Sequence, residues 1–330
     1  MGWLARAIDA GIEYRKPLAD LEDDLFLDTG AHRAKSTKFW VQLALSSVIA
    51  AGGVIGDSTP AVIGAMIIAP LGTPIYGLAL AAVVGDRREL RASLRLLLGG
   101  IAVNILIGVL IGLVTVNRMP LDVNPQIVGR TAPTVLDLTV AVAVGIAGSF
   151  ALSRRDVADI LAGVAIAISL VPVLAVVGIT LGSLHFDLAL GAFILFLTNV
   201  AAILVAGALV FSAAGYQRDA RDRDERAGRR ARRWIIALLV ILLIPLGAAS
   251  AQILRYELLK QDVERATEGW LAGTAWQLDG VEQSGNEFVI KVMGPNSAPP
   301  LSELRAAIRE QVPEWIPITV IEEAGRRSPL

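Results

Sequence analysis

The residues best placed to do chemistry in this sequence are prolines and polar side chains that interrupt long apolar stretches. The clearest interruption is APLGTP, residues 69–74, where two prolines and a glycine fall within one hydrophobic run. Each proline lacks a backbone donor and disfavours helical geometry in the preceding residue, so nearby carbonyl groups lose their helical partners. Such carbonyls can bind an ion or solute inside a membrane, and a packing kink is the alternative interpretation. The candidate residues of this segment are Pro70, Gly72, Thr73 and Pro74.

Two asparagines, Asn104 and Asn199, lie near the middle of two other apolar stretches. An amide without hydrogen-bond partners is costly in an apolar environment, so each asparagine must bind a neighbouring helix or a solute. Both interpretations remain open. Three further candidates extend a polar path toward them: Ser169, Pro172 and Thr198.

A turn signal, Gly56-Asp57-Ser58-Thr59-Pro60, separates the first two apolar stretches. Asp57, Ser58 or Thr59 can cap the following helix, because Pro60 suits a first helical position. The alternative interpretation is that Asp57 attracts cations or carries a proton at a pore mouth. These three polar residues therefore join the candidate site.

Several other chemistries are excluded by residue content. The sequence has no cysteine and only two histidines, which leaves no thiolate site and almost no histidine-based metal site. The HExxH spacing of zinc proteases is absent, and no apolar stretch offers a histidine or lysine base for Ser149. We therefore expect neither enzymatic activity nor a cofactor. A net charge of −1 also argues against a nucleic-acid partner.

The elements that must position these residues are membrane helices. The chain has 330 residues, of which 54% are hydrophobic and 18% charged, with a mean hydropathy of +0.60. A soluble domain has about 25% charged residues, and a membrane-spanning helix takes roughly 20 apolar residues. Seven transmembrane helices are predicted, at about 39–56, 60–84, 92–116, 134–152, 157–181, 186–211 and 234–252. The first follows 38 largely polar residues and is not expected to be a cleavable signal peptide.

Basic residues predict the orientation of these helices. With a cytoplasmic N-terminus, the inside segments from Arg33 onward hold 17 lysines and arginines, and the outside loops hold two, Arg118 and Arg130. Lysine and arginine favour the cytoplasmic side. We therefore expect a multi-pass protein of the inner membrane with its N-terminus in the cytoplasm and residues 253–330 outside.

The apolar pattern recurs after about 95–98 residues. Residues 39–116 and 134–211 each contain three predicted spans, and the recurrence places Pro172 opposite Pro74 and Asn199 opposite Asn104. Two three-span units in succession must have opposite orientations, which gives an inverted repeat of the kind found in secondary transporters. Chance resemblance between apolar helices is the alternative.

Glycines predict where helices approach closely. Three pairs are spaced four residues apart: Gly52 and Gly56, Gly108 and Gly112, Gly178 and Gly182. This spacing lets helix backbones come together and concerns packing rather than chemistry.

The segments outside the membrane have three distinct patterns. Residues 1–38 fit short amphipathic helices that lie in the headgroup plane or pack against a neighbouring subunit. Residues 215–233 are a cytoplasmic linker with eight arginines. Residues 253–330 predict a small α/β domain with a helix near 253–268, strands near 275–281, 287–293 and 316–322, and a helix from Pro300 to about Val312. The predicted organisation is 1–38 N-terminal segment, 39–214 six-span domain, 215–233 linker, 234–252 seventh span and 253–330 outer domain.

The stretch from Ser46 to Gly85 resembles a known family. Its most specific part, GAMIIAPLGTPI at Gly64–Ile75, is similar to the core of domain of unknown function 389, a hydrophobic domain of bacterial and archaeal membrane proteins. The resemblance covers about 40–215 and implies an integral membrane protein with several spans. It implies no substrate. Many relatives carry a further soluble domain at one end, whereas this chain has a short N-terminal segment and the tail after span seven.

These observations predict a helical membrane protein, associated with the lipid bilayer as a homo-oligomer, that moves a small solute or ion through a site between broken helices. The contrasting hypothesis is a membrane-anchored sensor or scaffold whose outer domain binds a partner. A hydrated cavity at mid-membrane depth favours transport, and a tightly packed bundle favours the scaffold.

Overall fold

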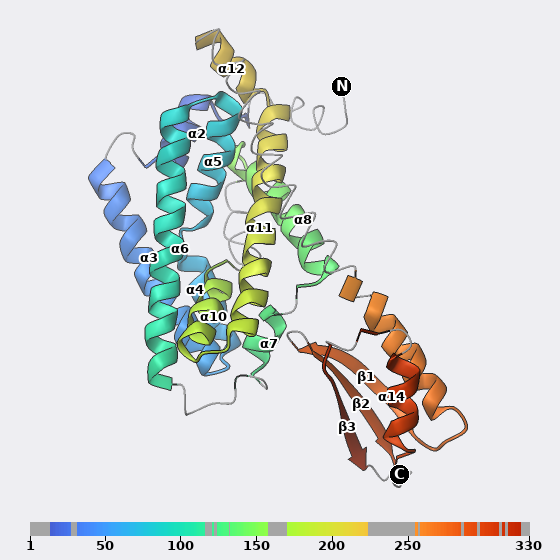
Figure 1. Ribbon diagram of the computed structural model, residues 1–330. Coiled ribbons are helices and arrows are strands. Elements are labelled where there is room, and N and C mark those ends of the chain that lie inside the picture. The colour runs from blue at the N-terminus through green and yellow to red at the C-terminus, as the bar shows by residue number, and fades with distance from the viewer. Residues whose placement is uncertain are drawn as a thin grey trace. The chain divides into compact units, whose positions relative to one another are not determined.

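The chain forms two compact units, Met1–Ala249 and Ser250–Leu330. The computed structural model describes residues 14–27, 32–115, 121, 124–131, 133–157, 170–223, 255–256, 258–284, 287–295, 298–309, 312–313 and 316–324. The first unit is helical and the second contains a small sheet (Figure 1).

The helical unit contains long apolar helices and shorter broken ones. Its described helices are α2 (Leu18–Leu25), α3 (His32–Ile55), α4 (Thr59–Ile68), α5 (Gly72–Val84), α6 (Arg87–Thr115), α7 (Pro125–Thr131), α8 (Val135–Leu152), α10 (Leu170–Gly182), α11 (Phe186–Ala213) and α12 (Tyr216–Arg223). Three of them, α3, α6 and α11, are long and apolar enough to cross a membrane, and the bent pairs α4/α5 and α7/α8 raise this number to five. The predicted fifth span lies only partly within the described residues, and the seventh lies outside them. Seven spans remain a prediction.

The second predicted span is broken where the prolines fall. Helix α4 ends at Ile68, α5 begins at Gly72, and their axes differ by 42°. Ala69 adopts an extended conformation with φ −65° and ψ 126°, which is the geometry that a following proline favours. Pro74 lies in the first turn of α5, where an amide donor has no helical partner to lose. The predicted break at 70–74 is confirmed within a few residues.

Two of the predicted glycine pairs pack against each other, across the contact between α6 and α10. A Cβ atom on Gly108 would lie 2.8 Å from the Cα of Gly178, and one on Gly182 would lie 2.5 Å from the carbonyl oxygen of Val109. Gly112 similarly lies against the backbone of Ile179. Only glycine permits this approach, so the close packing predicted for these pairs is confirmed.

The prediction for the remaining pair, Gly52 and Gly56, is wrong by one residue. A Cβ on Gly52 would meet nothing within 4 Å. A Cβ on Gly56, which follows α3, would meet only the carbonyl oxygen of Gly52 in α3. Gly53 is the glycine that faces α4, because its Cβ would lie 3.0 Å from Val62. One residue turns a helix by about 100°, which separates the packed face of α3 from its exposed side.

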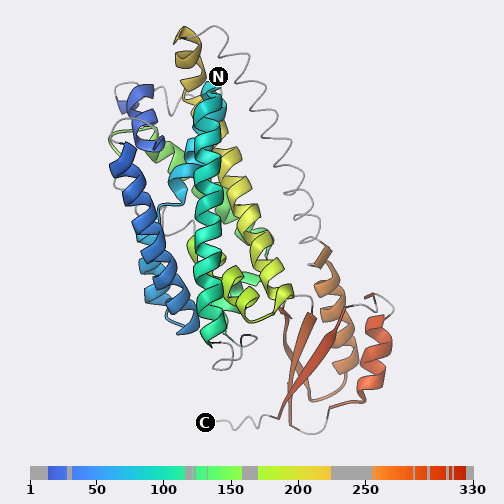
Figure 2. The same cartoon turned by 60° about the vertical axis from the view of Figure 1, so that its left-hand side comes forward.

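The two short helices α5 and α10 lie in opposite halves of the helical unit, beside the long helices α6 and α11 (Figure 1). Helix α6 packs against α10, and α11 packs against α5. At the second contact, a Cβ on Gly207 of α11 would lie 3.1 Å from the Cβ of Ala79. Both crossings therefore use a small residue to bring a long helix close to a short one. Figure 2 shows the same arrangement from a second direction.

An N-terminal segment crosses one end of the helical unit. Leu18, Leu21 and Leu25 are buried, and α2 packs against α5 of the same chain. The sequence interpretation of this helix as lying in the headgroup plane or against another subunit is therefore wrong for residues 18–25. Their apolar side chains pack against α5 of the same chain.

Polar contacts attach the same segment to two other elements. The backbone nitrogen of Lys16 donates to the carbonyl of Ser153, 2.9 Å away, after α8. Arg15 pairs with Asp219 of α12 at 2.6 Å and lies over the ring of Tyr216. Residues 14–27 thus join α5, α8 and α12 at this end.

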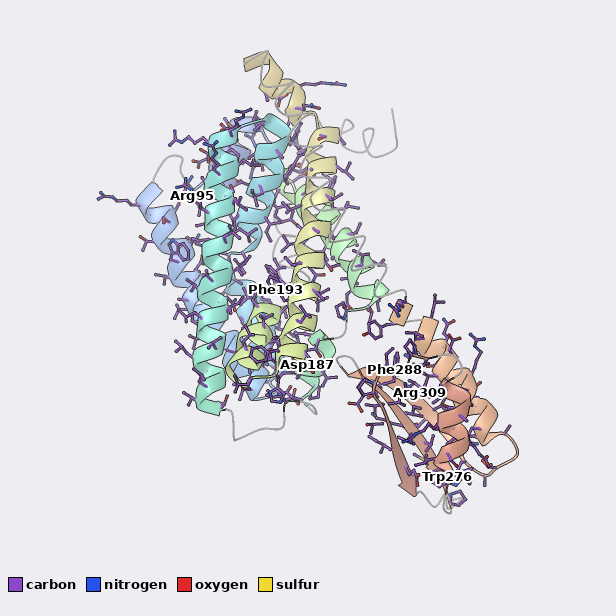
Figure 3. The ribbon with its side chains drawn as sticks, in the orientation of Figure 1. Arg95, Asp187, Phe193, Trp276, Phe288 and Arg309 are labelled. Atoms are coloured by element: carbon purple, nitrogen blue, oxygen red, sulfur yellow. The ribbon has the colours of Figure 1, made fainter. Side chains whose placement is uncertain are left out.

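The C-terminal unit is an α/β structure with its own core. Strands β1 (Gln277–Ser284), β2 (Glu287–Gly294) and β3 (Ile318–Ala324) lie in the order β1-β2-β3, and α14 (Leu301–Arg309) connects β2 to β3. The first two strands are antiparallel, and β3 is parallel to β2. Phe288 pairs with Ile318 and Ile290 with Val320, so alternate apolar residues of the two strands lie side by side. Phe288, labelled in Figure 3, is fully buried.

Candidate functional site

A pocket of about 320 Å³ lies among α7, α8, α10 and α11 of the helical unit. Its lining is apolar except for three side chains. The lining residues are Gly129, Arg130, Leu136, Asp137, Val140, Ala141, Val173, Leu195, Asn199 and Ile203. The pocket therefore extends from the first turn of α8 along the middle of α11, where Leu195, Asn199 and Ile203 line it. Its volume falls at the lower end of the range for small-molecule sites.

Arg130 reaches the pocket from α7. Its Nη1 donates to the backbone carbonyl oxygen of Gln126 at 2.7 Å and to the side-chain Oε1 of Gln126 at 3.0 Å. Its Nε is buried without a hydrogen-bond partner. Within the described part of the chain, no carboxylate forms an ion pair with Arg130.

Helix α7 is held in place by a glycine on α11. A Cβ on Gly191 would collide with the carbonyl oxygen of Thr131, the last residue of α7. The missing side chain lets the end of α7 rest directly on α11. Gly191 therefore sets the position from which Arg130 enters the pocket.

Asp137 is satisfied by its own helix. Its Oδ2 accepts hydrogen bonds from the backbone nitrogen of Thr134 at 2.8 Å and from the Thr134 hydroxyl at 2.7 Å. The backbone nitrogen of Asp137 donates to the Thr134 oxygen in return, which completes a capping box at the start of α8. The positive end of the helix dipole further stabilises this carboxylate.

The two asparagines predicted for the site flank the first turn of α10. Asn104 is fully buried, and its Nδ2 donates to the carbonyl of Val171 at 3.3 Å, one residue before Pro172. Asn199 lies on the other side, where it lines the pocket together with Val173. The Oδ1 atoms of both amides are buried without a partner. Asn104 thus forms an interhelical bond, and Asn199 faces the pocket.

The turn between α3 and α4 contacts α7 without lining the pocket. Asp57 is exposed and has a left-handed backbone with φ 45°, and Ser58 occupies the N-cap position without a side-chain hydrogen bond. Pro60 is the second residue of α4, not the first. The Oγ1 of Thr59 accepts a hydrogen bond from Gln126 Nε2 at 3.0 Å. Gln126 therefore joins the predicted residue Thr59 to Arg130.

The remaining predicted residues lie apart from the pocket. Pro70, Gly72, Thr73 and Pro74 form the junction between α4 and α5. The Thr198 hydroxyl donates to the carbonyl of Ile194 in its own helix at 2.9 Å, so it does not extend a polar path. Ser169 lies outside the described residues.

Sequence reasoning missed Arg130 and the residues that position it. Arg130 counted only as one of two basic residues in the outer loops. The available signal was the spacing of Gln126 and Arg130, which four residues apart share one face of a helix, together with Pro125 at a helix start.

The pocket lies within a segment shared with known proteins. Residues 66–205 match the model of a family described as a domain of unknown function, DUF389. Over 176 residues the chain is 34% identical to an uncharacterized protein of Methanocaldococcus jannaschii. This alignment covers 53% of the chain and 53% of that protein, so the chain spans about half the length of the curated relative it matches. The resemblance inferred from GAMIIAPLGTPI is confirmed.

Proposed function

We propose that this chain, whose residues 66–205 match the model of domain of unknown function 389, is a multispanning protein. We propose further that it moves a small solute or ion across the inner membrane. The pocket lined by Asn199 carries this proposal. Polar and charged groups are expensive within an apolar bundle, and they mark solute or ion pathways in membrane proteins. Arg130, Asp137 and Asn199 line one pocket among helices of high hydropathy.

The arrangement of α5 and α10 supports the proposed inverted repeat. The two helices end 98 positions apart, at Val84 and Gly182, and Pro74 and Pro172 have the same separation. The crossing of α6 with α10 has its counterpart in the crossing of α11 with α5. An inverted repeat places the two short helices in opposite halves of the bilayer, with the site of a transporter near the interface between the repeats.

The surface of the helical unit is consistent with lipid contact. Leu98, Leu106 and Leu110 on α6 are each more than half exposed. Figure 3 shows Arg95 and Asp187 toward opposite ends of the unit. The positive-inside rule assigns the end with Arg95 to the cytoplasm, so the pocket lies in the outer half. Exposed apolar helices also suit contact with a second copy.

Flux into proteoliposomes tests the proposed function. We expect wild-type protein to transport at least one member of a broad panel of radiolabelled ions and small metabolites. Asn199→Leu should reduce this flux at least tenfold, because leucine removes the amide that faces the pocket. Leu197→Ala, two residues away on the exposed side of α11, should retain wild-type flux.

No flux across the whole panel would contradict transport and favour the second candidate, a membrane-anchored sensor or scaffold. That candidate is supported by the C-terminal unit, whose core of Phe288, Ile290, Leu304 and Ile308 belongs to it alone. Equal flux through wild type and Asn199→Leu would place the transport route elsewhere in the chain.

A further inference from the structure

The charges that line the pocket are compensated unequally. Asp137 is the acidic side chain of the lining, and its Oδ2 already accepts two hydrogen bonds at the start of α8. Arg130 is the basic side chain, and its hydrogen bonds go to neutral oxygens of Gln126. The carboxylate therefore has local compensation, whereas the guanidinium does not.

An uncompensated, partly buried guanidinium favours a negatively charged ligand. Removing a cation from water is costly unless an anion or several hydrogen bonds replace the lost hydration. The buried Nε of Arg130 has no partner, so the protein satisfies the donor fork only in part. This planar fork matches the oxygens of a carboxylate or a similar anion.

A second polar side chain of the lining suits an anion as well. Asn199 lines the pocket and carries an amide that donates as well as accepts.

We propose that this pocket binds a small monoanion, such as a short carboxylate or a halide, with Arg130 as its main contact. The proposal rests on the transport function in that it identifies the chemical class of the solute. Binding itself does not require transport, and the two can be measured separately.

Equilibrium binding of radiolabelled acetate, chloride and sodium to purified full-length protein in detergent tests the proposal. We expect saturable binding of acetate or chloride that weakens at least tenfold in Arg130→Gln. Arg95→Gln, an exposed arginine on α6, should bind like wild type. Saturable binding of sodium alone, no saturable binding of either anion, or equal anion binding by Arg130→Gln would overturn the proposal.

A second variant guards against misfolding. Arg130→Lys keeps the charge and loses the planar fork, so it should bind the same anion with a weaker affinity than wild type. If Arg130→Gln does not fold, unchanged anion affinity in Arg130→Lys would count against the role of Arg130.

Flux of the same three ions separates the two proposals. Sodium flux without anion flux or anion binding would leave transport intact and overturn the anion site. Anion binding at Arg130 without any flux would support the anion site and contradict transport.

Discussion

Gly178→Val is expected to destabilise the helical unit by about 3 kcal/mol or more, at the upper end of the effects of overpacking. The reason is the crossing of α6 and α10, where a Cβ on Gly178 would lie within 2.9 Å of two backbone atoms of Gly108. It would also collide with the carbonyl oxygen of Ile105. Backbone atoms cannot move aside as a flexible side chain can, so the two helices must separate.

The measurement is the thermal unfolding of purified protein in detergent, with Gly52→Val as the matched control. Both glycines lie in apolar helices, but a Cβ on Gly52 meets nothing within 4 Å. The control should therefore unfold at the wild-type temperature. Equal unfolding temperatures for Gly178→Val and Gly52→Val would contradict the close crossing of α6 and α10.

Separation of these helices also affects the site. The bond from Asn104 to the carbonyl of Val171 spans the same contact, at the start of α10. Interhelical hydrogen bonds in membranes contribute about 0.6–2 kcal/mol, so this bond alone cannot hold the crossing. The glycines bring α10 close enough for it to form.

The Gly191→Ala variant is expected to show at least tenfold lower flux than wild type. The substitution should also destabilise the protein by about 1–3 kcal/mol. The added methyl group would collide with the carbonyl oxygen of Thr131, and α7 must move away from α11. Arg130 precedes Thr131 and moves with it. The variant therefore tests whether the position of α7 controls the pocket, without changing any residue that lines it.

Proteoliposome flux and detergent unfolding are the two measurements for this variant. Gly64→Ala is the control, because a Cβ on Gly64 in α4 meets nothing within 4 Å. It should keep wild-type flux and stability. Wild-type flux through Gly191→Ala would show that transport does not depend on the placement of α7.

The sequence predicts most of the elements because their signals are local. Pro70 forces an extended conformation on Ala69, and that rule alone locates the break between α4 and α5. Alternating apolar residues in β2 and β3 predict which face of each strand is buried, since that face repeats every second residue.

Helix partners are harder to predict because they depend on tertiary contacts. Gly52 and Gly53 are equivalent in an apolar sequence, and only the position of α4 shows that Gly53 faces it. The apolar stripe of α2 predicts a buried face without naming α5 as the element that covers it.

The sequence predicts only part of the candidate site, because the arrangement of the site also depends on tertiary contacts. Asn199 attracts attention because an amide is unusual within an apolar run, and it lines the pocket. Arg130 lies in a polar loop, where an arginine is ordinary. Its importance follows from Gly191, which is far away in sequence and brings α7 against α11.

The central claim is that a water-accessible pocket reaches Asn199 from the outer side of the membrane. Because the sequence contains no cysteine, a single introduced thiol reports on its own position. Thiol reagents react with the thiolate, which forms in water and not in lipid. The most direct test is the labelling of Asn199→Cys and Leu197→Cys in intact cells by a membrane-impermeant thiol reagent. We predict rapid labelling at 199 and little at 197, and an unlabelled Asn199→Cys, or equal labelling of the two, would contradict the account.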